Sequence, residues 1–303
     1  MTEASTTVLG AEPAPLGGGG PPPRRARGIL RALLANRSGA VGAVLTGVVV
    51  LAALASYAGL TPFDPVAQHA ADRLQGPGGT YWLGTDQFGR DTFSRAVAGA
   101  AGSLQVAVVA VAISAVVGSA AGVLAGWFGS AVRAPVLAVT NILFAFPPLL
   151  LALALASMFT RSWFTIAIAI AVVYVPIFVR VARGPVLSLR ETEFVRAAVV
   201  VGMPTWRVLL REVLPNLLPV LIVQVTLSLS WAVLTEASLS FLGLGTPPPA
   251  ASLGSMVLDA RVLVTIAWWT MAAPGVVIVL LVVGLNLLGD GLRDVLDPRR
   301  AVR

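Results

Sequence analysis

The feature that most constrains this chain is a series of six apolar runs. A helix needs about 20 mostly apolar residues to cross the roughly 30 Å of hydrocarbon in a bilayer. The runs cover residues 41–60, 104–128, 134–159, 163–179, 217–245 and 262–289. Their only acidic residue is Glu236, in the fifth run. They predict an all-α, polytopic membrane bundle with six transmembrane helices.

The composition agrees with a chain that lies mostly in lipid. Hydrophobic residues make up 57% of the 303 residues and charged residues 12%, and the mean hydropathy is +0.87. A soluble domain carries about 25% charged residues. Asn141 and the Pro147-Pro148 pair interrupt the third run, and together with Pro176 and Pro274 these prolines predict kinks or breaks in the helices.

The segments around the runs complete the predicted organisation. Residues 1–23 are polar and rich in Gly and Pro, which predicts a disordered cytoplasmic tail. Residues 24–40 place arginines around an apolar stripe, which predicts an amphipathic helix at the membrane interface before the first span, 41–60. An extracytoplasmic segment follows at 61–103, then the core of the bundle at 104–289 and a cytoplasmic tail at 290–303.

The arginines predict how the bundle is oriented. Six spans place both termini on one side, and cytoplasmic loops carry an excess of basic residues. Sixteen of the 21 arginines lie in the two terminal segments and in the loops after the second and fourth runs. Both termini are therefore predicted to be cytoplasmic in a cell membrane. The formal charge of +7 then reflects orientation in the bilayer, and no nucleic-acid partner is expected.

Missing residue types exclude several kinds of chemistry. The chain has no Lys, so it lacks the P-loop that cradles ATP phosphates in most ATPases. It has no Cys and a single His, His69, which excludes a thiol nucleophile and a two-histidine zinc motif. No catalytic, cofactor-binding or metal-binding residues are predicted, and the chain is expected to be a non-enzymatic protein.

The loop between the fourth and fifth runs, residues 180–216, predicts a helical hairpin. A capping box at Ser188 to Glu191 predicts a helix that runs to about residue 201. Gly202 then allows that helix to end, and a second helix over 205–214 stops at Pro215. The hairpin is either a solvated connector or a docking element. Its apolar side chains, among them Phe194 and Trp206, favour docking of a partner.

This hairpin resembles a known motif. Ala197-Ala198, Gly202 four residues on and the later Leu214-Pro215 are similar to the EAA loop of ABC-importer permeases. The resemblance implies that the hairpin docks on a separate ATPase subunit. Arg196 stands where the family has Glu, and Glu193 lies about one helical turn earlier. The implied coupling residues are Glu193, Arg196, Ala197, Ala198, Gly202, Met203, Pro204, Trp206, Leu214 and Pro215.

Three further blocks resemble one branch of these permeases. Residues 81–95 are similar to the HxLGTDxxGRDxxSR signature of the dipeptide, oligopeptide and nickel branch, and residues 236–249 and 290–298 resemble the same branch. The first block is expected to position the second span. In it, Asp86 is predicted to cap a helix and Asp91 to pair with Arg95.

The resemblance implies a fold, a function and a set of partners. The fold is that of a type I ABC-importer permease, and the chain forms half of a translocation pathway with a second, homologous permease. Two ATPase subunits would bind ATP and Mg, and an extracytoplasmic binding protein would deliver the substrate. A di- or oligopeptide is the expected substrate, and a nickel chelate is the second option.

Two other classes of protein are weighed against this interpretation. A stand-alone secondary transporter or channel would show inverted repeats or several buried ionisable residues, and an intramembrane enzyme would need paired catalytic groups. Glu236 is the one candidate for proton coupling, but it lies among hydroxyl groups and has no basic partner in a span. It is therefore interpreted as a residue of the pathway. The pathway candidates are Glu236, Ser230, Thr235, Ser238 and Asn141.

Overall fold

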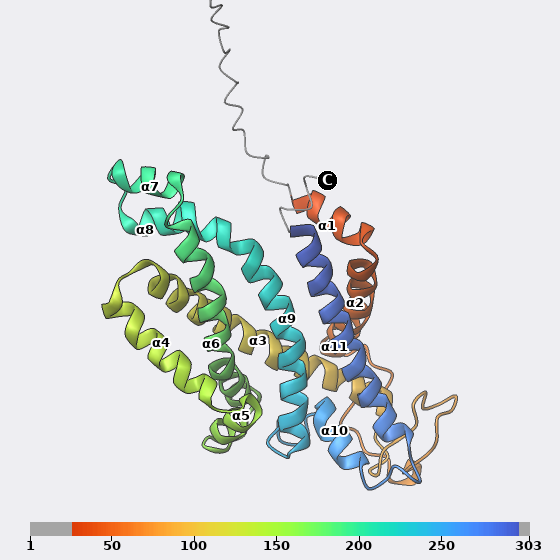
Figure 1. Ribbon diagram of the computed structural model, residues 1–303. Coiled ribbons are helices and arrows are strands. Elements are labelled where there is room, and N and C mark those ends of the chain that lie inside the picture. Colours follow the sequence, from red (N-terminus) through yellow and green to blue (C-terminus); the bar gives the residue numbers. More distant parts are fainter. Residues whose placement is uncertain (1–25, 297–303) are drawn as a thin grey trace, which may run out of the picture.

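The computed structural model describes residues 26–296, and within that range the chain is built from helices (Figure 1). The helices are α1 Ala26–Ala35, α2 Arg37–Tyr57, η1 Ala70–Asp72, α3 Thr92–Trp127, α4 Ser130–Ala145, α5 Pro148–Ser157, α6 Trp163–Leu189, α7 Glu193–Val200, α8 Thr205–Val208, η2 Leu209–Val213, α9 Leu214–Phe241, α10 Leu253–Ala260 and α11 Trp269–Leu296. The predicted tail at 1–23 and residues 297–303 of the C-terminal tail lie outside the described residues.

Five helices are long and apolar enough to cross a membrane on their own, and a bent pair brings the number to six. The five are α2, α3, α6, the continuous helix from Thr205 to Phe241, and α11. The bent pair is α4 and α5, whose axes differ by 95°. The all-α membrane bundle is therefore confirmed. The third predicted span is not one straight helix, because Pro147 and Pro148 end α4 and start α5.

The helices extend beyond the apolar runs that predicted them. Helix α3 starts at Thr92, inside the segment predicted as extracytoplasmic, and α6 continues from the fourth run to Leu189. Helix α11 starts at Trp269, later than its run, and ends at Leu296, inside the predicted tail. Hydropathy marks the part of a helix that suits lipid, whereas caps set its ends. Asp91 caps α3, where its Oδ2 accepts the amide of Ser94 at 2.8 Å.

Proline alone does not end a helix in this bundle. Pro176 and Pro185 lie inside α6, and Pro274 lies inside α11. The kinks or breaks expected at 176 and 274 are therefore not breaks, since the chain stays helical through both prolines. Of the prolines expected to kink or break a span, the 147–148 pair is the one that separates two helices in residues 26–296, because two successive residues there lack an N–H group.

The predicted interfacial helix is present but shorter than expected. Helix α1 ends at Ala35, and Asn36 caps α2, so the first span begins at Arg37. The Asn36 Nδ2 also donates to Asp294 Oδ2 of α11 at 3.0 Å. This contact fixes the start of the first span against the end of the last helix.

Helices α3 and α6 approach each other closely along a row of glycines. A Cβ atom placed on Gly118 would lie 2.6 Å from Phe178 Cβ, and one on Gly126 would lie 2.9 Å from Val186 Cβ. Between them, a Cβ atom on Gly122 would lie 2.5 Å from the carbonyl oxygen of Val179. Small residues at every fourth position let two membrane helices pack backbone to backbone. We call these three residues the glycine seam.

Figure 1 shows that the bundle has two distinct ends. Helices α7 and α8 lie at one end, together with α1 and the C-terminal end of α11. Helix α10 and the irregular segment before α3 lie at the opposite end. We refer to them as the α7 end and the α10 end. Both ends of the described chain thus lie at the α7 end.

The glycine seam generates a stability prediction. Gly122→Leu should lower the free energy of unfolding by about 1–3 kcal/mol, because the added side chain overlaps the backbone of α6. Gly47→Leu, in α2, is the matched control, since no atom lies within 4 Å of its added Cβ. Thermal unfolding of both variants in detergent measures the difference. Equal melting temperatures would contradict the close approach of α3 and α6.

Candidate coupling surface and polar contacts of the bundle

The hairpin after α6 begins later than its sequence predicts. Ser188 lies inside the last turn of α6, so the capping box predicted at Ser188 to Glu191 is wrong. Helix α7 starts at Glu193, after Thr192, whose hydroxyl donates to the Leu189 carbonyl at 2.6 Å. Because α6 extends to Leu189, Ser188 is part of α6 and does not cap α7.

The end of α7 agrees with the prediction. Gly202 has a φ of +82°, a conformation that side chains with a Cβ disfavour. The Gly202 amide donates to the Val199 carbonyl at 3.0 Å, and the Met203 amide donates to the Ala198 carbonyl at 3.1 Å. Pro204 then occupies the cap position of α8. These bonds satisfy carbonyls that the end of a helix leaves free, and they hold the hairpin tightly closed.

The second helix of the hairpin does not stop at Pro215, and this prediction is wrong. Residues 205–241 form one helix, with a π turn at Leu209–Val213 directly before Leu214 and Pro215. Pro215 has no N–H group for the carbonyl one turn earlier, and the wider π turn accommodates that loss. Asn216 Nδ2 donates to the Glu212 carbonyl at 2.6 Å, which satisfies another backbone group there. The hairpin is therefore continuous with the span α9.

The hairpin exposes an apolar surface. Val195 and Val208 are buried, and α7 packs against α8 and the π turn that follows it. Val200 and Val201 are 84% and 85% exposed, and Phe194, Val199 and Trp206 are exposed beside them. We call these five exposed residues the apolar coupling surface. An exposed apolar patch outside lipid is typical of protein-interaction sites.

Two arginines of the hairpin, Arg190 and Arg196, contact other residues of this chain. Arg196 forms an ion pair with Glu191, and this contact lowers the pKa of the exposed Glu191 carboxyl below its usual range. Arg190 donates to the Trp127 carbonyl at 2.9 Å and so joins the hairpin to the end of α3. Glu193 is exposed in the first turn of α7, where the helix dipole favours an acid. Of the two acids Glu191 and Glu193, Glu191 is paired with Arg196, and Glu193 forms no ion pair among residues 26–296.

Glu236 is buried inside the chain rather than exposed along its surface. Its side chain is 1% exposed and accepts hydrogen bonds from Ser103 of α3 at 2.5 Å and from Ser240 at 2.6 Å. The carboxylate therefore links α9 to α3, with its polar atoms satisfied as membrane interiors require. Its assignment to the pathway stays a prediction.

The other four pathway candidates do not gather on one surface. Ser230 is buried and donates to the Val282 carbonyl of α11 at 3.1 Å, and Thr235 lies 2.9 Å from the hydroxyl of Tyr174 in α6. Ser238 donates to its own helix, at the Leu234 carbonyl. Asn141 of α4 is exposed and accepts from Arg180. Their common role as pathway residues also stays a prediction.

Arg180 was not predicted as a site residue, although it contacts one. Its guanidinium carbon lies 3.9 Å from the centre of the Phe144 ring, and its Nη2 lies 3.3 Å from the Asn141 Oδ1. A cation over an aromatic ring is attracted by the ring's electron density. The sequence offered one signal, namely that Arg180 directly follows the fourth apolar run.

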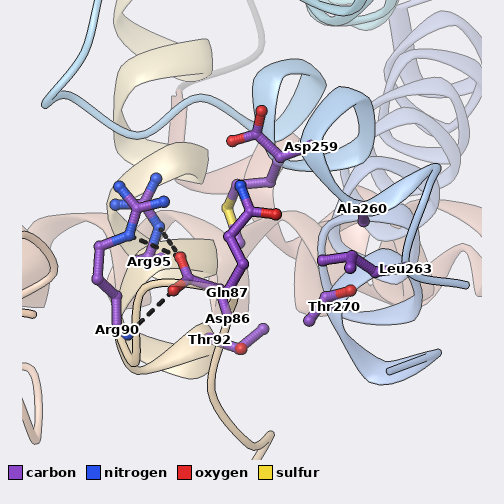
Figure 2. A pocket seen from close by; sticks show the side chains of 10 residues that line it. Asp86, Gln87, Arg90, Thr92, Arg95, Asp259, Ala260, Leu263 and Thr270 are labelled. Atoms are coloured by element: carbon purple, nitrogen blue, oxygen red, sulfur yellow. Dashed lines mark hydrogen bonds and ion pairs between the residues drawn. The ribbon is translucent and has the colours of Figure 1, made fainter. Parts of the chain in front are cut away.

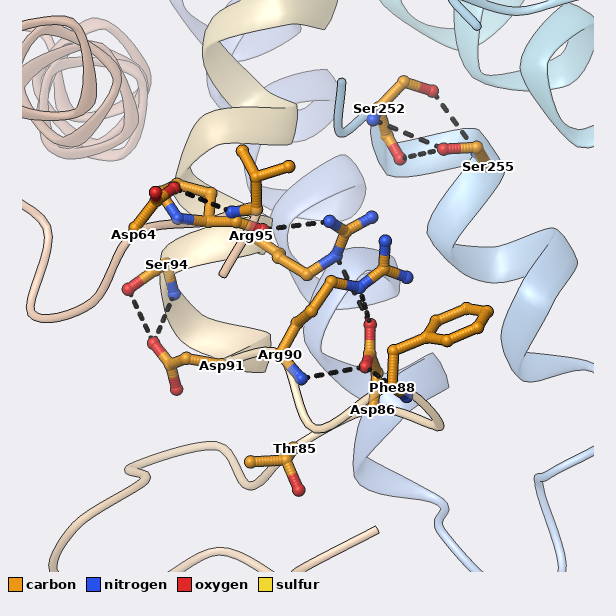
Figure 3. Close-up of polar contacts among 12 residues, drawn as sticks. Asp64, Thr85, Asp86, Phe88, Arg90, Asp91, Ser94, Arg95, Ser252 and Ser255 are labelled. Atoms are coloured by element: carbon orange, nitrogen blue, oxygen red, sulfur yellow. Dashed lines mark hydrogen bonds and ion pairs between the residues drawn. The ribbon is translucent and has the colours of Figure 1, made fainter. Parts of the chain in front are cut away.

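The motif at 81–95 folds around Asp86, not around the predicted Asp91–Arg95 pair. Asp86 Oδ2 lies 2.6 Å from Arg90 Nε and 3.5 Å from Arg95 Nε (Figure 3). Asp91, not Asp86, caps the helix α3. The Trp269 indole donates to the Thr85 carbonyl at 3.1 Å, so the motif is fixed to the start of α11. The expected role of positioning the second span agrees with these contacts.

Comparisons with known proteins give the family. Residues 118–302 match the family described as the binding-protein-dependent transport system inner membrane component. This chain belongs to that family of multi-pass membrane permeases, within the larger class of ABC importers.

Similar proteins indicate to which branch of the family this chain belongs. The chain is 41% identical over 274 residues to the dipeptide transport system permease protein of Alkalihalophilus pseudofirmus, which covers 90% of each chain. It is 41% identical over 240 residues to the probable D,D-dipeptide transport system permease protein of Escherichia coli, covering 79% of this chain and 80% of the relative. It is 36% identical over 254 residues to the glutathione transport system permease protein of Pectobacterium atrosepticum, covering 83% and 84%. By sequence it falls within the dipeptide branch of the family.

The buried carboxylate generates a prediction for α9. Glu236→Leu should lower the free energy of unfolding by about 1–3 kcal/mol, because two serine hydroxyls lose their acceptor. Glu236→Gln should lose less, since its amide oxygen still accepts one bond. Ser238→Ala is the control, because that hydroxyl contacts only its own helix. The link between α3 and α9 would be contradicted if Glu236→Leu unfolded at the same temperature as the control.

Proposed function

We propose that this permease is one half of the translocation pathway of an ATP-driven peptide importer, and that it couples to separate ATPase subunits through the hairpin at 193–215. The α7 end is cytoplasmic in this proposal, and the α10 end faces an extracytoplasmic binding protein. A second, homologous permease completes the pathway. Two ATPase subunits bind the ATP and Mg, since this chain contains no Lys for a P-loop.

The observation that carries the coupling proposal is the apolar coupling surface on α7 and α8. Val200 and Val201 are almost fully exposed, and α7, which ends at Val200, is not one of the helices long enough to cross a membrane. Water disfavours such a surface, so a partner that covers it gains free energy. An ATPase subunit is the partner that the family implies, because the transport is ATP-driven and this chain lacks a P-loop.

The contacts of the hairpin explain how movement of an ATPase subunit would reach the membrane. Helix α8 is continuous with the span α9. Arg190 joins the start of the hairpin to Trp127 at the end of α3. A displacement of α7 therefore acts on at least two spans at once. The bundle can then alternate between two states whose populations ATP binding shifts.

A di- or oligopeptide is the proposed substrate. The relatives in organisms as distant as Alkalihalophilus pseudofirmus and Pseudomonas aeruginosa carry dipeptide or di/tripeptide permease names. A relative named as a glutathione permease also belongs to the matched set. Glutathione is itself a small peptide, so these names share one class of substrate.

The conformation at Gly202 provides a test of coupling. Gly202→Val should reduce ATP-driven peptide uptake by more than tenfold while the protein stays inserted, because valine disfavours the φ of +82° that ends α7. Gly59→Val is the matched control, since Gly59 also has a positive φ and open space but follows α2 at the α10 end. Uptake and ATP hydrolysis are measured on the reconstituted complex. Normal uptake by Gly202→Val would overturn the coupling role of the hairpin.

The apolar coupling surface provides a second test. Val200→Glu should weaken copurification of the ATPase subunits, because it places a charge in the contact that the partner covers. Val66→Glu, an exposed valine in the segment before α3, is the control. Quantitative pull-down with each variant gives the comparison. Equal recovery of ATPase subunits would show that they bind elsewhere.

A further inference from the structure

A cavity of about 410 Å³ with several charged and polar residues in its lining lies at the α10 end of the bundle. Four stretches of the sequence form it: the segment before the motif at 81–95, residues 87–95 of that motif, the turn before α6, and residues 240–259. Its lining includes Gln68, Gln87, Arg90, Arg95, Arg161 and Asp259. The family assignment gives no role to this cavity. Its volume lies in the range of sites for small molecules, about 300–1,000 Å³.

Two nearly buried arginines share one carboxylate at the wall of this cavity. Arg90 is 8% exposed and Arg95 is 4% exposed. Figures 2 and 3 both show their guanidinium groups next to each other, with Asp86 as the common partner. Arg95 also donates from Nη1 to the Pro65 carbonyl at 3.0 Å. The terminal Nη1 and Nη2 groups of Arg90 have no hydrogen-bond partner among residues 26–296.

The charged groups around the cavity leave a positive excess. Arg161, an exposed residue from the turn before α6, adds a third guanidinium to the lining. The acids nearby are Asp86, which pairs with Arg90 and Arg95 (Figure 2), and Asp259 of α10, which also lines the cavity. Three arginines therefore face two carboxylates. An anion in the cavity would accept charge-assisted hydrogen bonds from guanidinium nitrogens that have no acceptor, so the site favours an added anion.

The chemistry of arginine selects the kind of anion. A guanidinium group presents a planar set of donors that matches a carboxylate with two parallel hydrogen bonds. The cavity also contains side-chain amide groups, at Gln68 and Gln87, that can bond to a peptide backbone. A small molecule with one carboxylate and neighbouring amide groups fits this lining.

We propose that the cavity binds the C-terminal carboxylate of the transported peptide, with Arg90 and Arg161 as its donors. This inference rests on the proposed function, because it takes the substrate to be a peptide. The concave shape favours a small molecule over an acidic side chain of the binding protein, since protein interfaces spread over wider and flatter surfaces. The cavity is thus the first site that this permease offers a peptide at the α10 end.

The test compares free peptides with their C-terminal amides on the complete transporter in lipid nanodiscs without binding protein. Equilibrium dialysis measures the affinity for dialanine, trialanine and the amide of each. Wild type should bind the free acids about tenfold more tightly than the amides, the change that one charge-assisted hydrogen bond produces. Arg161→Gln and Arg90→Lys should remove that preference, since Lys keeps the charge but not the planar donors. Arg73→Gln, an exposed arginine outside the cavity, should keep it.

Several outcomes would overturn the proposal. Equal binding of acids and amides by wild type, no binding of either, or an unchanged preference in Arg161→Gln would each do so. The proposal also fails if Arg161→Gln weakens attachment of the empty binding protein and leaves peptide binding intact, because the carboxylate would then belong to that protein. ATP-driven uptake by wild type, measured separately with binding protein, tests the proposed function itself. A complex that binds the free acids but imports no peptide would contradict only the proposed function.

Discussion

The backbone contact between α3 and α6 is the interaction on which the rest of the bundle depends. It exists because Gly118, Gly122 and Gly126 leave space for the backbone and side chains of α6. Helix α3 starts beside the motif at 81–95 and ends at Trp127, whose carbonyl binds Arg190. One helix therefore connects the cavity at the α10 end with the coupling surface at the α7 end. A membrane provides little hydrophobic drive between helices, so this close packing must supply much of the cohesion.

A second connection runs through α9. Because α8 continues through a π turn into α9, the second helix of the hairpin is an extension of a span rather than a separate loop. The buried polar groups of α9 then bind it to its neighbours: Glu236 accepts from Ser103 of α3, and Ser230 donates to α11. Two residues predicted to line the pathway, Glu236 and Ser230, thus also hold three helices together. A displacement of α8 would be passed to α3 and α11 by hydrogen bonds that no water can replace.

The sequence predicted the spans well and their ends poorly, for one physical reason. Apolar runs report contact with lipid, and every run found its helix or helix pair. Helix ends depend on local hydrogen bonds instead. Pro176 and Pro215 were expected to interrupt helices, yet the chain stays helical through Pro176 and passes Pro215 after a π turn. The Pro147-Pro148 pair differs because two adjacent residues lack donors, and the helix axis turns by 95° there.

The same distinction explains which sites the sequence revealed. The coupling hairpin is contiguous, so the spacing of Ala197, Gly202 and Pro215 could indicate it without any tertiary contact. The cavity at the α10 end is lined by Arg161, by residues 87–95 of the motif and by Asp259. These residues are far apart in the sequence, so no local sequence pattern predicts that they share a cavity. Within the motif, the i,i+4 spacing predicted that Asp91 pairs with Arg95. In the structure a turn brings Asp86 to Arg90 and Arg95, and Asp91 caps α3 instead. In the sequence, Arg90, Arg95 and Arg161 are separate charged residues of two loops. They line one cavity only when the bundle has assembled around α3.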